Sequence, residues 1–389
     1  MNVNWNYPTA VRTGPGRISE LADACKELGM RDPLLVTDPG LASLPMVAET
    51  VRHCADKGIN CGVFSDIKSN PTGENVDAGV AQYRDGKHDG VIAFGGGSGL
   101  DAAKAVALLA GQSRPLWDFE DVGDNWLRAD ANAIAPIVAV PTTAGTGSEV
   151  GRASVITDMA NHVKRIIFHP RMLPQVVILD PELTFGLPPQ LTAATGMDAL
   201  SHNLEAYSSP MYHPMAEGIA VQGINLVKDH LPTAVADGSN LEARTQMLVA
   251  SCMGATAFQR GLGAMHALAH PLGALYDAHH GTLNAVLMPY VLLANRTAIE
   301  DRIVRLSRYL DLADTSFDGF VNWVVRLREQ IGIPNDLAAL GIDDDQLRTI
   351  GSMAVQDPTA ATNPIQFSAA EYTALVSRAL SGTLFVSSQ

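Results

Sequence analysis

The C-terminal half of the chain carries a cluster of residues of the types that ligate metals in proteins. It consists of six candidates: Asp198, His202, His266, His270, His279 and His280. The first two are four residues apart, as are the next two, and residues at i and i+4 share one helix face, so each pair can point at one ion. A single histidine in such Ala- and Leu-rich surroundings would more often be a hydrogen-bonded core residue. The cluster therefore favours a metal site, and one carboxylate with three imidazoles suits Fe²⁺ or Zn²⁺.

A glycine-rich segment in the first half has the composition of a phosphate-binding turn. The segment GGGSGLDAAK (95–104) follows the apolar run DGVIAF (89–94) and opens a helical pattern. Glycines let backbone amides approach a pyrophosphate, and the positive end of the following helix dipole adds to the anion site. The segment matches neither G-x-G-x-x-G nor the Walker A pattern, and a glycine turn between strand and helix often serves only tight packing.

A second loop, PTTAGTGSEV (141–150), directly follows the apolar run IAPIVAV (134–140). Its hydroxyls and glycines suit hydrogen bonds to ribose and phosphate oxygens, although a loop that caps a helix has a similar composition. Two such loops at the ends of successive strands favour a dinucleotide site over packing alone.

The elements that must position these loops are short β-branched runs alternating with helical patterns. Buried parallel strands are predicted at 33–37, 60–64, 89–94 and 134–140, with further β-rich stretches at 154–158, 163–168 and 176–180. Apolar residues at i, i+3 and i+4 predict helices over 17–28 and 42–57, which is typical of βαβ units in an open doubly wound sheet.

After Pro189 the pattern changes to long Ala- and Leu-rich segments, which predict a mostly helical half. The expected helices cover 193–207, 215–230, 241–258, 298–309, 317–330, 344–354 and 368–380. The proline-rich segment 181–190 marks the expected boundary between the two domains. We expect a dinucleotide-binding α/β domain over 1–185 and a helical metal- and substrate-binding domain over 186–389.

Composition excludes several classes of protein. The 389 residues are 47% hydrophobic and 17% charged, with a formal net charge of −14. This describes a globular protein and argues against nucleic acid or an anionic membrane surface as partner, because phosphate binding needs clustered Lys and Arg. The four cysteines form no CxxC pair, and no signal peptide or run of 18 apolar residues is evident. We expect reduced thiols and a cytoplasmic location.

The motifs together resemble one known family, the iron-dependent (group III) alcohol dehydrogenases. The resemblance rests on GGGSGLDAAKA, PTTAGTGSEV, TGMDALSHNLEAY and GLGAMHALAHPLGALYDAHHGTLNA, in that order along nearly the whole chain. It implies a dehydroquinate synthase-like fold, in which an α/β N-terminal domain with a Rossmann-like parallel sheet precedes an all-α C-terminal domain. It also implies reversible hydride transfer between a small, mostly primary alcohol and NAD, with Fe²⁺ or Zn²⁺, by a homodimer or larger homo-oligomer.

The resemblance also implies roles for individual residues of the helical half. The metal ligands would be Asp198, His202, His266 and His280. His279 stands where the family usually has proline, and His280 is assigned because it directly precedes the family's Gly and Asn-Ala. His270 would lie near the nicotinamide and substrate as the catalytic proton carrier.

For the cofactor, the resemblance implies eight contacts: Gly96, Gly97 and Ser98 at the pyrophosphate, Thr142, Thr143 and Thr146 at the nicotinamide half, Lys164 at one ribose and Asp38 at the adenosine ribose. A carboxylate at Asp38 would accept bonds from the 2′-hydroxyl and repel a 2′-phosphate, so NAD is favoured over NADP. Asp-Pro-Gly is also strong turn chemistry, which is the alternative role of Asp38.

Several functions remain open from the sequence. One is an NAD- and metal-dependent lyase of the dehydroquinate synthase type, which would recycle its cofactor instead of releasing NADH. A hydroxy-acid or semialdehyde dehydrogenase of the same family would need a cation for the substrate carboxylate; Arg152 and Arg260 flank the motifs, although a surface salt bridge is their simpler role. A non-catalytic nucleotide-binding protein would leave the metal ligands unexplained, and a metal hydrolase would leave both loops unexplained.

Overall fold

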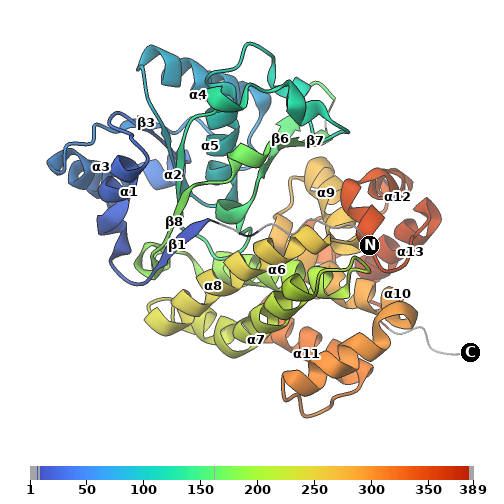
Figure 1. Cartoon of the computed structure of the whole chain (residues 1–389). Coiled ribbons are helices and arrows are strands. Elements are labelled where there is room, and N and C mark those ends of the chain that lie inside the picture. The colour runs from blue at the N-terminus through green and yellow to red at the C-terminus, as the bar shows by residue number, and fades with distance from the viewer. Residues whose placement is uncertain (1–6, 8, 162, 385–389) are drawn as a thin grey trace, which may run out of the picture. The chain divides into compact units, whose positions relative to one another are not determined.

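The computed structural model describes residues 7, 9–161 and 163–384. Within that part the chain forms two compact units, Tyr7–Gly186 and a second that begins at Leu187 (Figure 1). The first is built around a sheet and the second is helical, as the sequence predicts.

A six-stranded parallel sheet forms the centre of the first unit. Its strands are β1 (Ala10–Thr13), β2 (Leu34–Val36), β3 (Gly62–Phe64), β4 (Val91–Gly95), β5 (Ile137–Pro141) and β8 (Val176–Leu179). The order across the sheet is β1-β8-β5-β4-β2-β3, and every neighbouring pair is parallel. After β2 the chain adds β3 on one side, and after β4 it adds β5 and β8 on the other side. The order of strands therefore reverses between β2 and β4. Such a reversal is where open α/β sheets bind their ligands.

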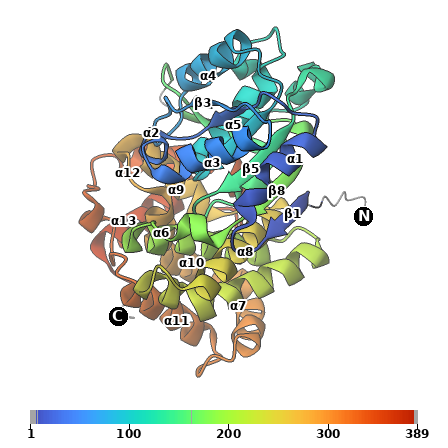
Figure 2. The same ribbon diagram turned by 90° about the vertical axis from the view of Figure 1, so that its left-hand side faces the viewer.

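Helices cover both faces of this sheet. They are α1 (Leu21–Glu27), α2 (Pro39–Ala42), α3 (Pro45–Asp56), α4 (Gly73–Asp85) and α5 (Gly97–Leu109). Alternate strand residues such as Leu35, Ile92 and Val138 pack with α1 and α3 in one buried cluster. Figure 2 shows α1 and α3 on one side of the sheet and α5 on the other. Because both faces are covered, the strands are apolar without alternation, which made them visible in the sequence.

Three details of the first unit differ from the sequence prediction. The helix expected over 42–57 is α3, which begins only at Pro45, and a separate short helix, α2, precedes it and ends at Ala42. The β-rich stretches at 154–158 and 163–168 are strands, as predicted; β6 (Ala153–Asp158) and β7 (Val163–Phe168) form an antiparallel hairpin apart from the main sheet. Edge strand β1 and helix α4 were not predicted, because β1 has four residues and little burial, and α4 is largely polar on its outer side.

The second unit consists of long helices and short connections. They are α6 (Pro189–Ser208), α7 (Pro214–Ala236), α8 (Leu241–Ala257), α9 (Ala264–Tyr276), α10 (His280–Tyr309), α11 (Phe317–Gln330), α12 (Leu347–Gln356) and α13 (Ala369–Ser381). The helix predicted over 298–309 is only the last part of α10, which continues through Pro289. In the described part of the chain no helix is both long and apolar enough to span a membrane.

Candidate functional site

The glycine-rich segment is a strand-to-helix turn at the reversal point of the sheet. Strand β4 ends at Gly95, Gly96 is the N-cap residue, and α5 begins at Gly97 without a side-chain cap. The backbone amides of the first turn of α5 are thus not capped by a side chain, as an anion site requires. Asp38 follows the neighbouring strand β2, and a Cβ on Gly95 would lie 3.7 Å from its Oδ2. The carboxylate of Asp38 also caps α2, since Leu41 N donates to it over 3.0 Å.

The threonine-rich loop lies directly against this turn. A Cβ on Gly96 would lie 3.3 Å from Thr143 Cγ2, and one on Gly97 only 2.6 Å from Thr146 Cγ2. Only glycine fits at residue 97, because real Cβ contacts are longer than this. Thr142 is buried and its amide donates to the carbonyl of Gly95 over 2.9 Å. The two loops found in the sequence therefore form one surface at the carboxyl ends of β4 and β5.

A buried polar network fixes the threonine loop to α5. Asp101 accepts hydrogen bonds from Ser148 Oγ over 2.5 Å and from Val155 N over 2.9 Å. Lys104 is buried, lies 3.2 Å from Asp101 and donates to the carbonyl of Ala153. These contacts give Asp101 and Lys104 a packing role in holding the loop.

Glu149 is a buried carboxyl that sequence reasoning missed as a titratable group. It is 2% exposed. Desolvation raises its pKa to about 7, against the opposing effects of a backbone hydrogen bond and of Lys104. The apolar environment thus favours the neutral form.

Two further predicted cofactor residues belong to the same unit and contact neighbouring loops. Ser98 Oγ donates to the carbonyl of Ser69. Lys164 on β7 donates to Asn70 Oδ1 over 2.9 Å. Both side chains are half-buried, and both contact the segment 69–70 that precedes α4.

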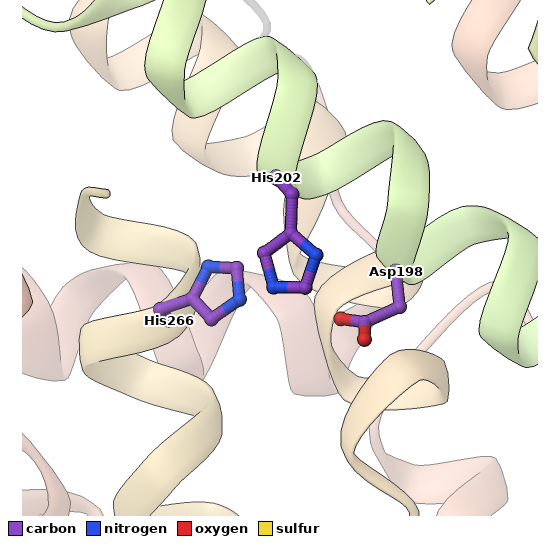
Figure 3. A group of neighbouring side chains, drawn as sticks. All are labelled: Asp198, His202 and His266. Atoms are coloured by element: carbon purple, nitrogen blue, oxygen red, sulfur yellow. The ribbon is translucent and has the colours of Figure 1, made fainter. Parts of the chain in front are cut away.

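In the helical unit, α6 and α9 bring together three predicted metal ligands. Asp198, His202 and His266 are all buried, and each offers one ligand atom within 4.8 Å of the others (Figure 3). The imidazoles of His202 and His266 are stacked, with ring centroids 4.8 Å apart. Asp198 and His202 share one face of α6, as their spacing predicts.

His280, at the start of α10, lies at the open side of this group. Its Nε2 is 3.6 Å from Asp198 Oδ1, and its side chain is 29% exposed, against 3% for Asp198. His279 instead precedes α10 as its N-cap residue, with Nδ1 3.4 Å from Thr282 Oγ1. The structure therefore brings His280, rather than His279, to the carboxylate.

Asn284, one helical turn after His280, faces the same point. Its Nδ2 lies 2.9 Å from Asp198 Oδ1, 3.3 Å from His266 Nε2 and 3.2 Å from His280 Nε2. Its own buried Oδ1 has no hydrogen-bond partner among the described residues. Three acceptor atoms thus converge on one neutral donor at the expense of an unsatisfied carbonyl.

The acceptor set fits a divalent cation. One carboxylate and three imidazoles are the donors that Fe²⁺ and Zn²⁺ take. Burial alone would raise the pKa of Asp198, but His202, His280 and His266 together with the Asn284 hydrogen bond hold it well below its usual range. The carboxylate is therefore ionised and available as a ligand.

His270 lies one turn beyond His266 on α9 and is held by a different residue. Its Nδ1 is 2.7 Å from Asp357 Oδ2, and its ring stacks on that of His280 with centroids 5.5 Å apart. Burial opposes ionisation of Asp357, but His270 and the Thr359 hydrogen bonds lower the pKa of the carboxyl. The structure thus places His270 beside the ligand group rather than within it.

Two further carboxylates were not predicted from the sequence: Asp357, beside His270, and Glu205, whose Oε2 is 2.6 Å from His266 Nδ1. Glu205 follows His202 by three residues on α6 and continues the face of Asp198, which is a signal that the sequence contained. Asp357 lies 87 residues after its partner, so spacing carried no signal for it.

The two candidate arginines lie in different surroundings, and only Arg260 is buried. Arg260 is 2% exposed, and its guanidinium donates to the carbonyls of Tyr207 and Met211 and pairs with Glu217 at 3.0 Å. The expectation of a surface position was wrong for Arg260, which ties α6 to its following loop. The guanidinium of Arg152 lies 5.6 Å from the ring centroid of Phe168.

Comparisons with known proteins agree with this arrangement. The profile of iron-containing alcohol dehydrogenases matches residues 8–181, and the profile of the C-terminal part of that family matches residues 192–380. The chain combines a parallel α/β unit with a helical unit that carries a buried Asp-His-His group. It belongs to the iron-containing alcohol dehydrogenase family and is an oxidoreductase of that family.

Individual relatives match over nearly their whole length. A 4-hydroxybutyrate dehydrogenase of Cupriavidus necator is 39% identical, covering 96% of this chain and 99% of the relative. A crystal structure of 1,3-propanediol oxidoreductase superposes with a TM-score of 0.93 at 36% identity, covering 98% and 100% of the two chains. The sulfoacetaldehyde reductase of Bifidobacterium kashiwanohense, in complex with NAD⁺, superposes with a TM-score of 0.89 at 29% identity, covering 98% and 99%.

Proposed function

We propose that this chain catalyses reversible, metal-dependent hydride transfer between a small, mostly primary alcohol and NAD. The observation that carries the proposal is the buried group of Asp198, His202 and His266, with His280 at its open side. The glycine and threonine loops at the reversal point of the sheet supply the second requirement, a surface for the cofactor pyrophosphate. The family match favours this activity over the lyase, hydrolase and non-catalytic alternatives.

In this mechanism the protein contributes positioning and proton transfer. When bound, the cation would supply Lewis acidity toward the alcohol oxygen, and NAD would supply the hydride acceptor. Asp198, His202, His266 and His280 would hold the cation. The Asp357 carboxylate orients His270 through Nδ1, so Nε2 is left to accept the proton that alcohol oxidation releases.

The cofactor is proposed to be NAD, with Fe²⁺ or Zn²⁺ as the metal. Gly96, Gly97 and Ser98 would contact the pyrophosphate, and Lys164 a ribose. The threonine loop would contact the nicotinamide half through Thr142, Thr143 and Thr146. An acidic Asp38 beside the glycine turn disfavours a 2′-phosphate. A relative that binds NAD⁺ with nearly the same fold supports this choice.

A short hydroxy acid is the second candidate substrate. The similarity to a 4-hydroxybutyrate dehydrogenase favours it. The structure removes one of its two candidate anchors, because the guanidinium of Arg260 is buried and already bonded. Arg152 remains as the cation that would pair with a substrate carboxylate. The cytoplasmic location and the homo-oligomeric assembly remain predictions.

The test is NADH oxidation with a panel of short aldehydes, neutral and acidic, by metal-stripped protein reloaded anaerobically with Fe²⁺ or Zn²⁺. NADPH serves as the cofactor control. We expect metal-dependent turnover with NADH, and the best aldehyde identifies the substrate class. Tight NADH binding without turnover under either metal would contradict the proposal. Arg152→Ala should lower kcat/KM for acidic aldehydes and leave kcat/KM for neutral aldehydes unchanged. An equal loss of kcat/KM for both classes would reject the role of Arg152.

A further inference from the structure

The carboxylate of Glu205 is buried against the first turn of α9. Its side chain is 4% exposed, Oε2 lies 2.6 Å from His266 Nδ1, and Oε1 accepts a hydrogen bond from Met265 N over 2.7 Å. Both oxygens are therefore tied to the segment that carries one metal ligand. No Lys or Arg side chain forms an ion pair with Glu205 in the described part of the chain.

These contacts determine how His266 presents its ring. With Nδ1 donating to Glu205, the lone pair of the neutral imidazole is on Nε2. The geometry at Nε2 agrees, because Asn284 Nδ2 lies 3.3 Å from that atom and acts as a donor. Nε2 is also the atom on the side of Asp198, since both accept from the same amide nitrogen.

The charge of the site also depends on Glu205. Asp198 supplies one negative charge at the ligand positions, and Glu205 supplies a second through His266. A buried dication is costly unless nearby charges compensate it. Asp198 and Glu205 compensate it through direct contact with the ligand group, whereas Asp357 acts on His266 only across space. The helical unit also buries three arginines, Arg244, Arg260 and Arg328. Their guanidinium groups donate hydrogen bonds to residues other than Glu205.

We propose that Glu205 is a positioning residue that sets the metal affinity of the site, by fixing the His266 tautomer and compensating the charge of the ion. This inference rests on the proposed metal site. It concerns the affinity of the folded protein for the ion, which is separable from turnover.

The chain offers a matched control four residues along α9. His270 Nδ1 meets Asp357 at 2.7 Å in the same way, but His270 lies outside the ligand group. Glu205→Gln and Asp357→Asn thus each remove one charge from one carboxylate–imidazole pair. Only the first should change how tightly the ion is held.

The experiment measures the Zn²⁺ dissociation constant of full-length, metal-stripped protein by competition with a chromophoric chelator. We expect Glu205→Gln to weaken Zn²⁺ binding by about 10- to 100-fold, and Asp357→Asn to leave it at the wild-type value. Glu205→Asp, which keeps the charge but shortens the reach, should fall between Glu205→Gln and wild type. It is also measured in case Glu205→Gln does not fold.

Four outcomes of this experiment would reject either the role of Glu205 or the metal site itself. Wild-type affinity in either Glu205 variant that folds would overturn the inference. So would a lower melting temperature of the stripped protein with unchanged affinity, which is the result of a purely structural carboxylate. Equal weakening by Asp357→Asn would also reject it, because the effect would then be one of general charge. Failure of the wild-type protein to bind Zn²⁺ would instead reject the metal site of the proposed function.

Discussion

Gly281 determines how closely α10 approaches α6 beside the metal ligands. A Cβ on Gly281 would lie 2.3 Å from the carbonyl oxygen of Ala194 and 3.2 Å from Cβ of Asp198. Ordinary contact begins at 3.4 Å, so the substitution Gly281→Ala must displace α10 from α6 by about 1.1 Å. Metal–ligand distances tolerate only about 0.2 Å. His280, the residue before Gly281, should therefore lose its place in the ligand group.

The assay is Zn²⁺ affinity by chelator competition, beside urea unfolding of the stripped protein. We expect Gly281→Ala to lose about tenfold or more in affinity and about 1–3 kcal/mol of stability through overpacking. Gly218→Ala on α7 is the control, because nothing lies within 4 Å of the added Cβ. It should bind Zn²⁺ as wild type does and gain up to about 1 kcal/mol from helix propensity. Wild-type affinity in Gly281→Ala would show that the close packing of α10 on α6 does not position His280.

Three further predictions concern the cofactor, the proton and the buried carboxyl. Asp38→Ser keeps a capping oxygen for α2 but removes the charge, so the ratio of kcat/KM for NADPH over NADH should rise; an unchanged ratio would reject the ribose role. Asp357→Asn should lower kcat by about tenfold or more while Zn²⁺ affinity stays constant, because His270 loses its orientation; unaltered kcat would count against the proton path. Burial raises the pKa of Glu149 from 4.5 to about 7. Between these two pH values the native state therefore binds more protons than the unfolded state. The free energy of unfolding should consequently fall as the pH rises from 4.5 to 7. Glu149→Gln should abolish this decline, worth about 3 kcal/mol, in urea unfolding at pH 5 and 8; an equal decline in the variant would show another group to be responsible.

The sequence predicts those parts of the fold that have a strong local pattern. Strands β2, β4 and β5 are buried on both faces and read as continuous apolar runs, and α11 over Phe317–Gln330 has the predicted bounds. Edge strand β1 has no such pattern, because it pairs with one neighbour and is largely exposed. The first half of α10 was not predicted, because Gly281, Asn284 and Pro289 are poor helix formers and interrupt the helical sequence pattern. Packing against neighbouring helices keeps this segment helical.

The candidate site divides in a similar way. Asp198 and His202 share a helix face, which their spacing predicts directly. The approach of His266 and His280 to that face depends on how α9 and α10 pack, so the sequence supplied it only through a resemblance. Glu205 and Asp357 were missed because a carboxylate in a helix or a loop is usually solvated, and burial against an imidazole is a tertiary property.

A catalytic metal is tested most directly by titrating metal into stripped wild-type protein and His202→Ala while NAD reduction by a short alcohol is followed. We expect wild-type activity to rise with added Fe²⁺ or Zn²⁺ and to reach a plateau at one ion per chain. His202→Ala, in which a buried ligand is lost from the group, should stay inactive while still binding NADH. Full activity of the stripped wild-type protein, or of His202→Ala, would contradict a catalytic metal at Asp198, His202, His266 and His280.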